Sequence, residues 1–163
     1  MKILLIGLII SIVGYFFLSP SYTLSRKAQK AYEQQDFQKA YEFSAQALKK
    51  DRYNKSAFQI HNQSKQRINI QNFLERAKKD FEDALTILKK SKLSPQELLE
   101  LQWIYDDFLA HYNNLFFTNK PTEQEKKAIE EYFNWFKQLK NKLLEAKEKM
   151  NLAKDSQSLQ ILK

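Results

Sequence analysis

Cysteine is absent from the 163 residues, which excludes disulfide bridges, thiolate metal sites and cysteine nucleophiles. Glycine and proline are scarce, at two and three residues, and strand-rich folds need both for their many turns. The only histidines are His61 and His111, and neither is followed three or four residues later by a histidine or carboxylate, as in helical zinc sites. We therefore expect an all-α protein that is not an enzyme and needs no metal and no cofactor.

The residues that are present favour a folded, basic protein. Apolar residues make up 43% of the chain, which argues against a disordered chain. The formal net charge is +8, yet lysines alternate with glutamates, as in residues 123–127 and 140–149. Such interleaving is typical of solvated helix faces, whereas nucleic-acid binders gather lysine and arginine on one face. We expect no nucleic-acid partner, and attraction to anionic lipid is the simpler consequence of the charge.

The first 20 residues differ from the rest. Residues 3–18, ILLIGLIISIVGYFFL, carry no charge and as a helix would span about 24 Å, slightly less than the hydrocarbon core of about 30 Å. Pro20 is expected to end this helix. A cleaved signal peptide is the alternative, but the bulky aromatic residues before Ser19 make a poor cleavage site. We expect residues 1–20 to form an uncleaved transmembrane anchor.

The orientation of the anchor follows from the charges on its two sides. Lys2 and the α-amine precede it, and Arg26, Lys27 and Lys30 follow it, so the balance slightly favours a cytoplasmic body. Short amino-terminal anchors with almost no leader usually send the following domain outward. The composition is typical of a bacterial protein. We expect a single-pass protein of the bacterial inner membrane with its body in the periplasm.

Four short helices are expected in residues 21–91. Apolar residues recur there at steps of three and four, and an aspartate or asparagine stands where three of the helices would begin. The expected helices are residues 24–34, residues 37–50 after Asp36, residues 54–68 from Asn54, and residues 73–90 after Asn72.

Two longer helices are expected after residue 91, each opened by a capping box. Ser94 stands three residues before Glu97, and Thr122 stands three residues before Glu125. Each helix carries an apolar seam that is typical of shallow helix packing. We expect an antiparallel hairpin in residues 92–155 and a frayed tail in residues 156–163.

Both tryptophans fall on this predicted hairpin. A buried tryptophan stabilises a core, whereas an exposed one is typical of a binding surface. We expect Trp103 and Trp135 to pack in the core.

An internal repeat runs through the first half of the body. Five positions from Phe37 to Leu48 match five from Leu74 to Leu85 at a constant offset of 37, with small residues at matching places. The stretch AQKAYEQQDFQKAYEFSAQALKKDRYN, residues 28–54, resembles a tetratricopeptide repeat, although Arg52 replaces the usual proline. A second, more degenerate unit would begin near Lys55. The repeat-packing positions are Ala28, Ala31, Phe37, Ala40, Ala47, Leu74, Ala77, Phe81 and Ala84.

The resemblance implies a surface that binds protein segments. In this family the first helices of successive units line a concave groove. The positions that match it here are Gln29, Tyr32, Glu33, Gln59, Gln63, Gln66 and Arg67. The alternative is that these residues form the solvent-exposed faces of ordinary amphipathic helices.

Two functions remain open at this point. The first is a membrane-anchored adaptor that holds an unidentified partner protein. The second is a membrane-tethered coiled-coil spacer, such as an envelope-spanning or lysis factor, which acts by forming a homo-oligomer through its last two helices.

Overall fold

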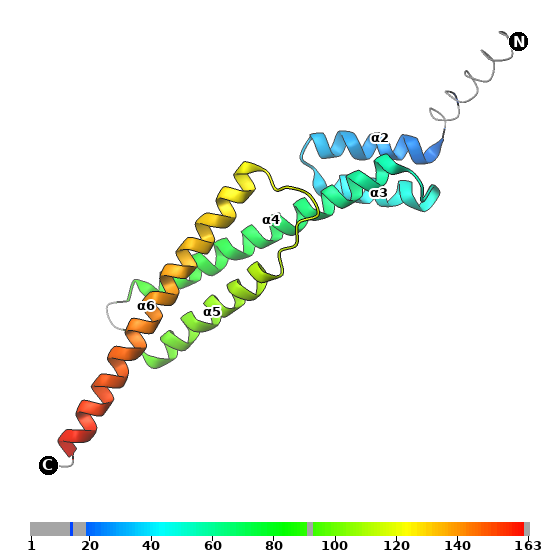
Figure 1. The fold of residues 1–163 in the computed structure, drawn as a ribbon. Coiled ribbons are helices and arrows are strands. Elements are labelled where there is room, and N and C mark those ends of the chain that lie inside the picture. Colours follow the sequence, from blue (N-terminus) through cyan, green and yellow to red (C-terminus); the bar gives the residue numbers. More distant parts are fainter. Residues whose placement is uncertain (1–13, 15–18, 91–92, 162–163) are drawn as a thin grey trace, which may run out of the picture. The chain divides into compact units, whose positions relative to one another are not determined.

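A computed structural model describes residue 14 and residues 19–90 and 93–161, with only the helical backbone in residues 150–161. The described helices, drawn in Figure 1, are α2 (Pro20–Glu33), α3 (Phe37–Lys50), α4 (Lys55–Leu88), α5 (Pro95–Asn113) and α6 (Glu123–Ile161). No strand occurs among these residues, so the all-α prediction is confirmed.

The predicted transmembrane anchor, residues 1–20, lies outside the described residues except for residues 14, 19 and 20. Among the residues that are described, no helix is both long and apolar enough to cross a membrane.

The chain divides into two compact units. Unit 1 comprises Met1–Asn69 together with the short segment Phe116–Lys120, and unit 2 comprises Ile70–Leu115 and Pro121–Lys163. The boundary expected near residue 91 therefore falls inside unit 2, because the second half of α4 belongs with α5 and α6.

In unit 1, α2 and α3 form a short antiparallel hairpin (Figure 1). The two helices pack through small side chains. Pro20 occupies the first turn of α2, where its missing N–H is no loss, so it begins a helix here. Small residues at helical spacing form the buried side of each helix and let the two backbones approach closely. They are Ser21, Ser25, Ala28 and Ala31 on α2, and Ala40, Ser44 and Ala47 on α3.

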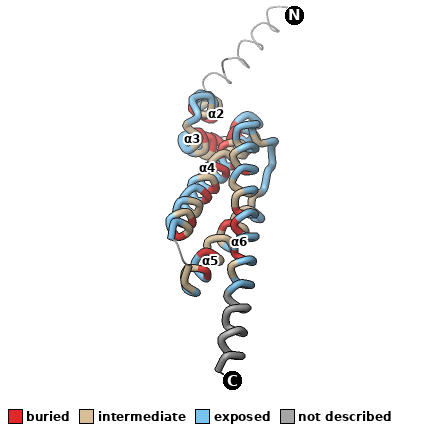
Figure 2. The backbone as a smooth tube through the Cα atoms, turned by 90° about the vertical axis from the view of Figure 1, so that its left-hand side faces the viewer, coloured by how far each residue is buried: buried red, intermediate tan, exposed pale blue. Residues whose placement is uncertain are grey.

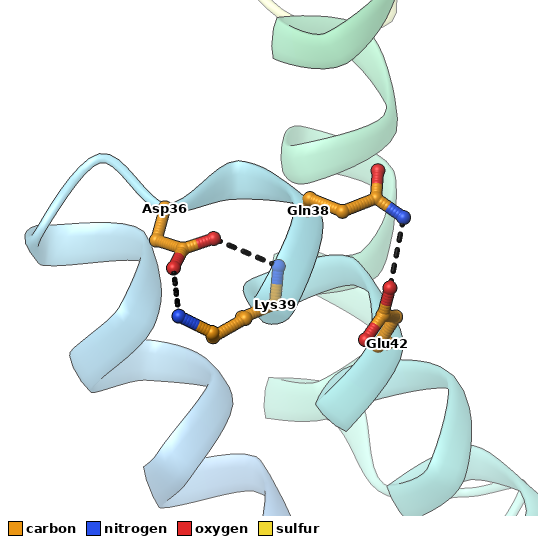
Figure 3. Close-up of polar contacts among 4 residues, drawn as sticks. All are labelled: Asp36, Gln38, Lys39 and Glu42. Carbon is orange, nitrogen blue, oxygen red and sulfur yellow. Dashed lines mark hydrogen bonds and ion pairs between the residues drawn. The ribbon is translucent and has the colours of Figure 1, made fainter.

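The turn between α2 and α3 is held at both of its ends. Gln35 has a φ of 61°, and the N–H groups of Gln35 and Asp36 donate to the carbonyls of Tyr32 and Ala31, as in a Schellman motif. Asp36 then caps α3, as predicted, because its Oδ1 accepts from the Lys39 N–H at 3.1 Å (Figure 3). The Lys39 ammonium lies 2.7 Å from Asp36 Oδ2, which lowers the pKa of the aspartate.

The expected break between residues 68 and 73 is wrong, because α4 is one helix from Lys55 to Leu88. Asn69 and Asn72 are exposed and no glycine or proline interrupts the segment, so the cost in helix propensity is small. Ile70 and Phe73 are 1% and 5% exposed, and burying each contributes about 2 kcal/mol. This burial outweighs the weak stop signal at Asn72, and the predicted second helical hairpin does not form.

In unit 2, both predicted capping boxes are present. Ser94 and Glu97 exchange backbone and side-chain hydrogen bonds at the start of α5. Thr122 and Glu125 do the same at the start of α6, at 2.8 and 3.2 Å. Buried residues recur along the inner sides of α4, α5 and α6, whereas residues 116–120 are exposed throughout (Figure 2).

Aromatic stacking dominates the core of unit 2. The rings of Phe108 and Phe136 stack at 3.8 Å between centroids, and both side chains are almost fully buried. Trp135 packs edge-on against Phe81 of α4 at 4.3 Å. Trp103 is 64% exposed, so its predicted core packing is wrong. Trp103 follows the seam residue Leu101 by two positions, which turns it about 200° around the helix.

The C-terminal tail is helical where fraying was predicted. α6 continues to Ile161, so residues 156–161, which were expected to fray, are helical.

Candidate functional site

The seven residues of the predicted groove all lie in unit 1, on α2 and on the first half of α4. Gln29, Glu33 and Gln59 are exposed, while Gln63 is partly buried. The Gln29 amide donates to Glu33 Oε1 at 2.8 Å along α2.

A hydrogen bond between Arg67 and Tyr32 joins the two helices of this surface. Arg67 Nε of α4 donates to the Tyr32 hydroxyl of α2 at 3.3 Å, and both side chains are partly buried. Tyr32 also packs edge-on against Phe37, with ring centroids 5.2 Å apart. We call Gln29, Tyr32, Glu33, Gln59, Gln63 and Arg67 the α2–α4 face.

Gln66 has a different role from the other predicted groove residues. It is 4% exposed, and its Oε1 accepts from the Asn119 N–H at 2.7 Å and the Thr118 hydroxyl at 3.0 Å. Its Nε2 donates to the Asn119 carbonyl at 2.8 Å. The whole amide is therefore used to hold residues 118–119 against α4, and it is not displayed to a partner. Sequence reasoning missed this role because the partners lie 52 and 53 residues away.

The predicted repeat-packing residues divide between the two units. Ala28, Ala31, Ala40 and Ala47 are buried in unit 1, and Phe37 is partly buried. The second set lies on α4 in unit 2, where Ala77 and Ala84 are buried, Leu74 is partly buried against the core and Phe81 is partly buried beside Trp135. The neighbours of this second set include aromatic residues of α5 and α6, such as Trp135.

His61 packs between helices of unit 1. Its ring stacks on Tyr41 of α3 at 4.4 Å, and its Nδ1 lies 3.4 Å from the Ser44 hydroxyl. Burial lowers the pKa of His61, with a smaller contribution from the charge of Lys65. A neutral, stacked imidazole is therefore the stable form, and its position is that of a packing residue.

His111 belongs to a polar cluster between α4 and α5. Its Nδ1 lies 2.8 Å from the Asp107 carbonyl and its Nε2 lies 2.7 Å from Arg76 Nη1. Arginine can only donate, so Nε2 accepts, and Nδ1 carries the proton that is donated to the carbonyl. Arg76 Nε also lies 3.3 Å from Asp107 Oδ2. The lone pair that a general base would use is thus occupied, and the cluster ties the two helices together.

Asp80 lies beside this cluster on α4. Burial raises the pKa of Asp80, the neighbouring Asp107 raises it further, and Arg76 opposes both effects. Asp107 stands four residues before His111, and this spacing is the sequence signal for the cluster. Zinc-site spacing counted forward from each histidine does not include Asp107. Among the described residues, no group of three or more histidine or acidic side chains is placed to hold a metal ion.

A groove of about 440 Å³ lies between α5 and α6 in unit 2. Tyr105, Phe108 and Leu109 line it on α5, and Phe133, Phe136 and Leu144 line it on α6. Its charged and amide groups come from α6 and are Lys137, Lys140 and Asn141. The volume and the mainly apolar lining are typical of binding sites, and we call this feature the α5–α6 groove.

No family model, curated protein or solved structure matches this chain.

Proposed function

We propose that the chain is a membrane-anchored adaptor that binds a partner protein and catalyses no reaction. Residues 3–18 would hold it in the bacterial inner membrane, with the helical units on the periplasmic side. The uncharged run of 16 residues supports the anchor, since its helical length comes close to the hydrocarbon thickness.

The α2–α4 face would take the partner. The observation that carries this proposal is the hydrogen bond between Tyr32 and Arg67, which fixes α2 beside α4. Exposed or partly exposed amides of Gln29, Gln59 and Gln63 lie on the same two helices. Amide side chains can donate to and accept from the backbone of a bound segment. This arrangement agrees with the tetratricopeptide resemblance of residues 28–54, in which first helices line the binding surface.

Site-specific crosslinking tests this proposal. A photoreactive amino acid is placed at Gln59 or Gln63 in the full chain in native membranes, and at exposed Gln46 on α3 as the matched control. We expect one and the same protein to be crosslinked from positions 59 and 63 and not from position 46. Replacing Gln59 and Gln63 with arginine should abolish that crosslink from a probe at Gln29 and leave the melting temperature unchanged. Equal labelling from all positions would refute the proposal.

The side of the membrane is tested separately. A reporter enzyme that is active only outside the cytoplasm is fused after Lys163, and a cytoplasm-specific reporter serves as its control. Activity of the first alone supports a periplasmic body, and activity of the second alone refutes it.

A second candidate function is the membrane-tethered spacer. α6 has 39 residues against 19 in α5, and its helical backbone continues 15 residues past Ala146, which packs against the core cluster. A long single helix of this kind can pair with a second copy. Sedimentation of the full chain in detergent distinguishes the two functions, because a concentration-dependent dimer supports the spacer and a monomer supports the adaptor.

A further inference from the structure

The α5–α6 groove has a rigid aromatic floor. Phe108 and Phe136 form it, with their rings stacked at 3.8 Å and 11° from parallel. Along α6 the lining extends from Phe133 to Leu144, which corresponds to about 16 Å, or three helical turns. Leu144 is 57% exposed, and Lys137 and Lys140 are exposed as well, so the groove is open to solvent on the side of these residues and is not a closed cavity.

The groove opens on the side of α6 that faces away from α4. Trp135 packs against Phe81 of α4, and it stands two residues from both Phe133 and Lys137 of the groove. Two residues correspond to about 200° around a helix, so Phe133 and Lys137 lie on the other side of α6 from the Trp135 contact. The floor residues Phe108 and Phe136 lie deeper, in the core cluster that α4 shares. No residue of α4 lines the groove. Three helices of unit 2 therefore leave vacant the position that a fourth helix takes in a four-helix bundle.

The charged groups of the groove have one sign. Lys137 and Lys140 line it, and no acidic residue does so. The Lys140 ammonium lies 5.7 Å from the centroid of the Tyr105 ring, so this charge is held over the groove wall. Two helical turns after Lys140 and outside the groove, Lys147 donates to Gln102 Oε1 at 2.9 Å, and Gln102 in turn donates to Asp106 Oδ1.

We propose that the α5–α6 groove binds an amphipathic helix of a partner protein, with acidic residues beside its apolar stripe. Apolar side chains at helical spacing would pack on Phe108, Phe136 and Leu144, and carboxylates on the flank would pair with Lys137 and Lys140. The polar outer side of such a helix would face water over the open groove. This site is separate from the α2–α4 face of the proposed function.

Two other occupants fit less well. A second copy of the chain docking through the same groove would bring its own Lys137 and Lys140 close to those of the first copy, and like charges repel. A single acyl chain with an anionic head would satisfy the lysines. However, it would leave one side of its hydrocarbon exposed along an open groove, which is unfavourable.

The test uses two synthetic helical peptides and the full chain in phosphatidylcholine nanodiscs. Both peptides have leucine at every third and fourth position, with glutamate on the flanks of one and lysine on the flanks of the other. Fluorescence anisotropy measures binding, and empty nanodiscs give the background. We expect saturable binding of the acidic peptide with a Kd about tenfold lower than that of the basic peptide, as expected for a pair of rim charges.

Charge reversal makes the test specific. The double variant Lys137→Glu with Lys140→Glu should reverse the preference, so that the basic peptide binds about tenfold more tightly than the acidic one. Both lysines are exposed, so the core is retained, and a misfolded chain would not acquire the opposite preference. Leu144→Asp should weaken the acidic peptide by about tenfold or more, because it removes an apolar contact and adds a charge of the same sign as the peptide. The unit 1 variant Gln59→Arg with Gln63→Arg should leave both affinities unchanged, which separates this site from the proposed function.

Three results would overturn the inference. In the first, neither peptide binds saturably, or the preference survives the charge reversal. In the second, oleate binds the wild-type chain and displaces the acidic peptide, which would assign the groove to an acyl chain. In the third, the chain forms a dimer in sedimentation that Leu144→Asp dissociates, which would assign the groove to a second copy.

Discussion

Asn54 and Ser21 are 33 residues apart in sequence, and the Asn54 amide donates to the Ser21 hydroxyl at 2.9 Å inside unit 1. The Ser21 hydroxyl in turn donates to the Ala47 carbonyl at 3.0 Å, at the end of α3. Asn54 Oδ1 accepts from the Ala57 N–H at 3.0 Å, which caps α4. One buried asparagine thus joins the start of α2, the end of α3 and the start of α4.

Replacing Asn54 with alanine should destabilise unit 1 by about 2–3 kcal/mol, because the change removes a helix cap and leaves buried polar groups without partners. Urea denaturation followed by circular dichroism measures the loss. Asn69→Ala, at an exposed position of the same helix, is the control and should change the free energy of unfolding by less than about 0.5 kcal/mol. Equal effects at the two positions would mean that the junction contributes little.

Gln35 stands where a helix end favours glycine. Its φ of 61° is left-handed, which strains a residue with a Cβ by about 1 kcal/mol or more. Gln35→Gly should therefore raise the free energy of unfolding by about 1 kcal/mol. At Gln34, where φ is −81°, the same change should lower it, since glycine there adds only chain entropy to the unfolded state. Thermal denaturation of the two variants should show melting temperatures shifted in opposite directions.

Local sequence signals located the ends of several helices. Asp36, Ser94 and Thr122 act within three residues of themselves, so the hydrogen bonds that they make can be predicted without tertiary structure. The helix start predicted after Asn72 is wrong because asparagine is only mildly unfavourable inside a helix. Burial of Ile70 and Phe73, which depends on α5 and α6, decided the outcome there.

The candidate sites were less predictable than the helices. Tyr32 and Arg67 were both expected at one surface, but their hydrogen bond joins residues 35 apart. Gln66 was assigned to the same surface because helix periodicity cannot show that residues 118–119 cover it. The α5–α6 groove was not predicted, because an apolar seam does not reveal how much of its width the facing helix covers.

Ser64 is a buried hydroxyl on α4 that makes no hydrogen bond among the residues described. An unsatisfied hydroxyl loses its interaction with water on folding and gains nothing in return. Ser64→Ala should therefore stabilise the protein by about 1 kcal/mol, measured by urea denaturation. Ser56→Ala, an exposed position on the same helix, should stay within about 0.5 kcal/mol of the wild type. A loss of stability in Ser64→Ala would show that the hydroxyl has a partner in solution.

The stability of unit 2 should depend on pH through the ionisation of Glu97. The Lys90 ammonium, with the Ser94 N–H and hydroxyl, lowers the pKa of Glu97 from 4.5 to about 2. In the unfolded chain the carboxyl titrates near its ordinary value, so the folded state holds fewer protons between the two values. The stabilisation by Glu97 is then complete above about pH 5 and is lost as the pH falls toward 2.

Glu97→Gln should accordingly lower the melting temperature at pH 7, and the difference from the wild type should shrink steadily between pH 5 and about pH 2. Melting temperatures measured by circular dichroism across this range provide the check. Glu75→Gln is the control, since Glu75 is an exposed carboxyl on α4 outside the capping box. A difference that stays constant from pH 7 to pH 2 would contradict the prediction, because it would show that ionisation of the Glu97 carboxyl does not contribute to stability.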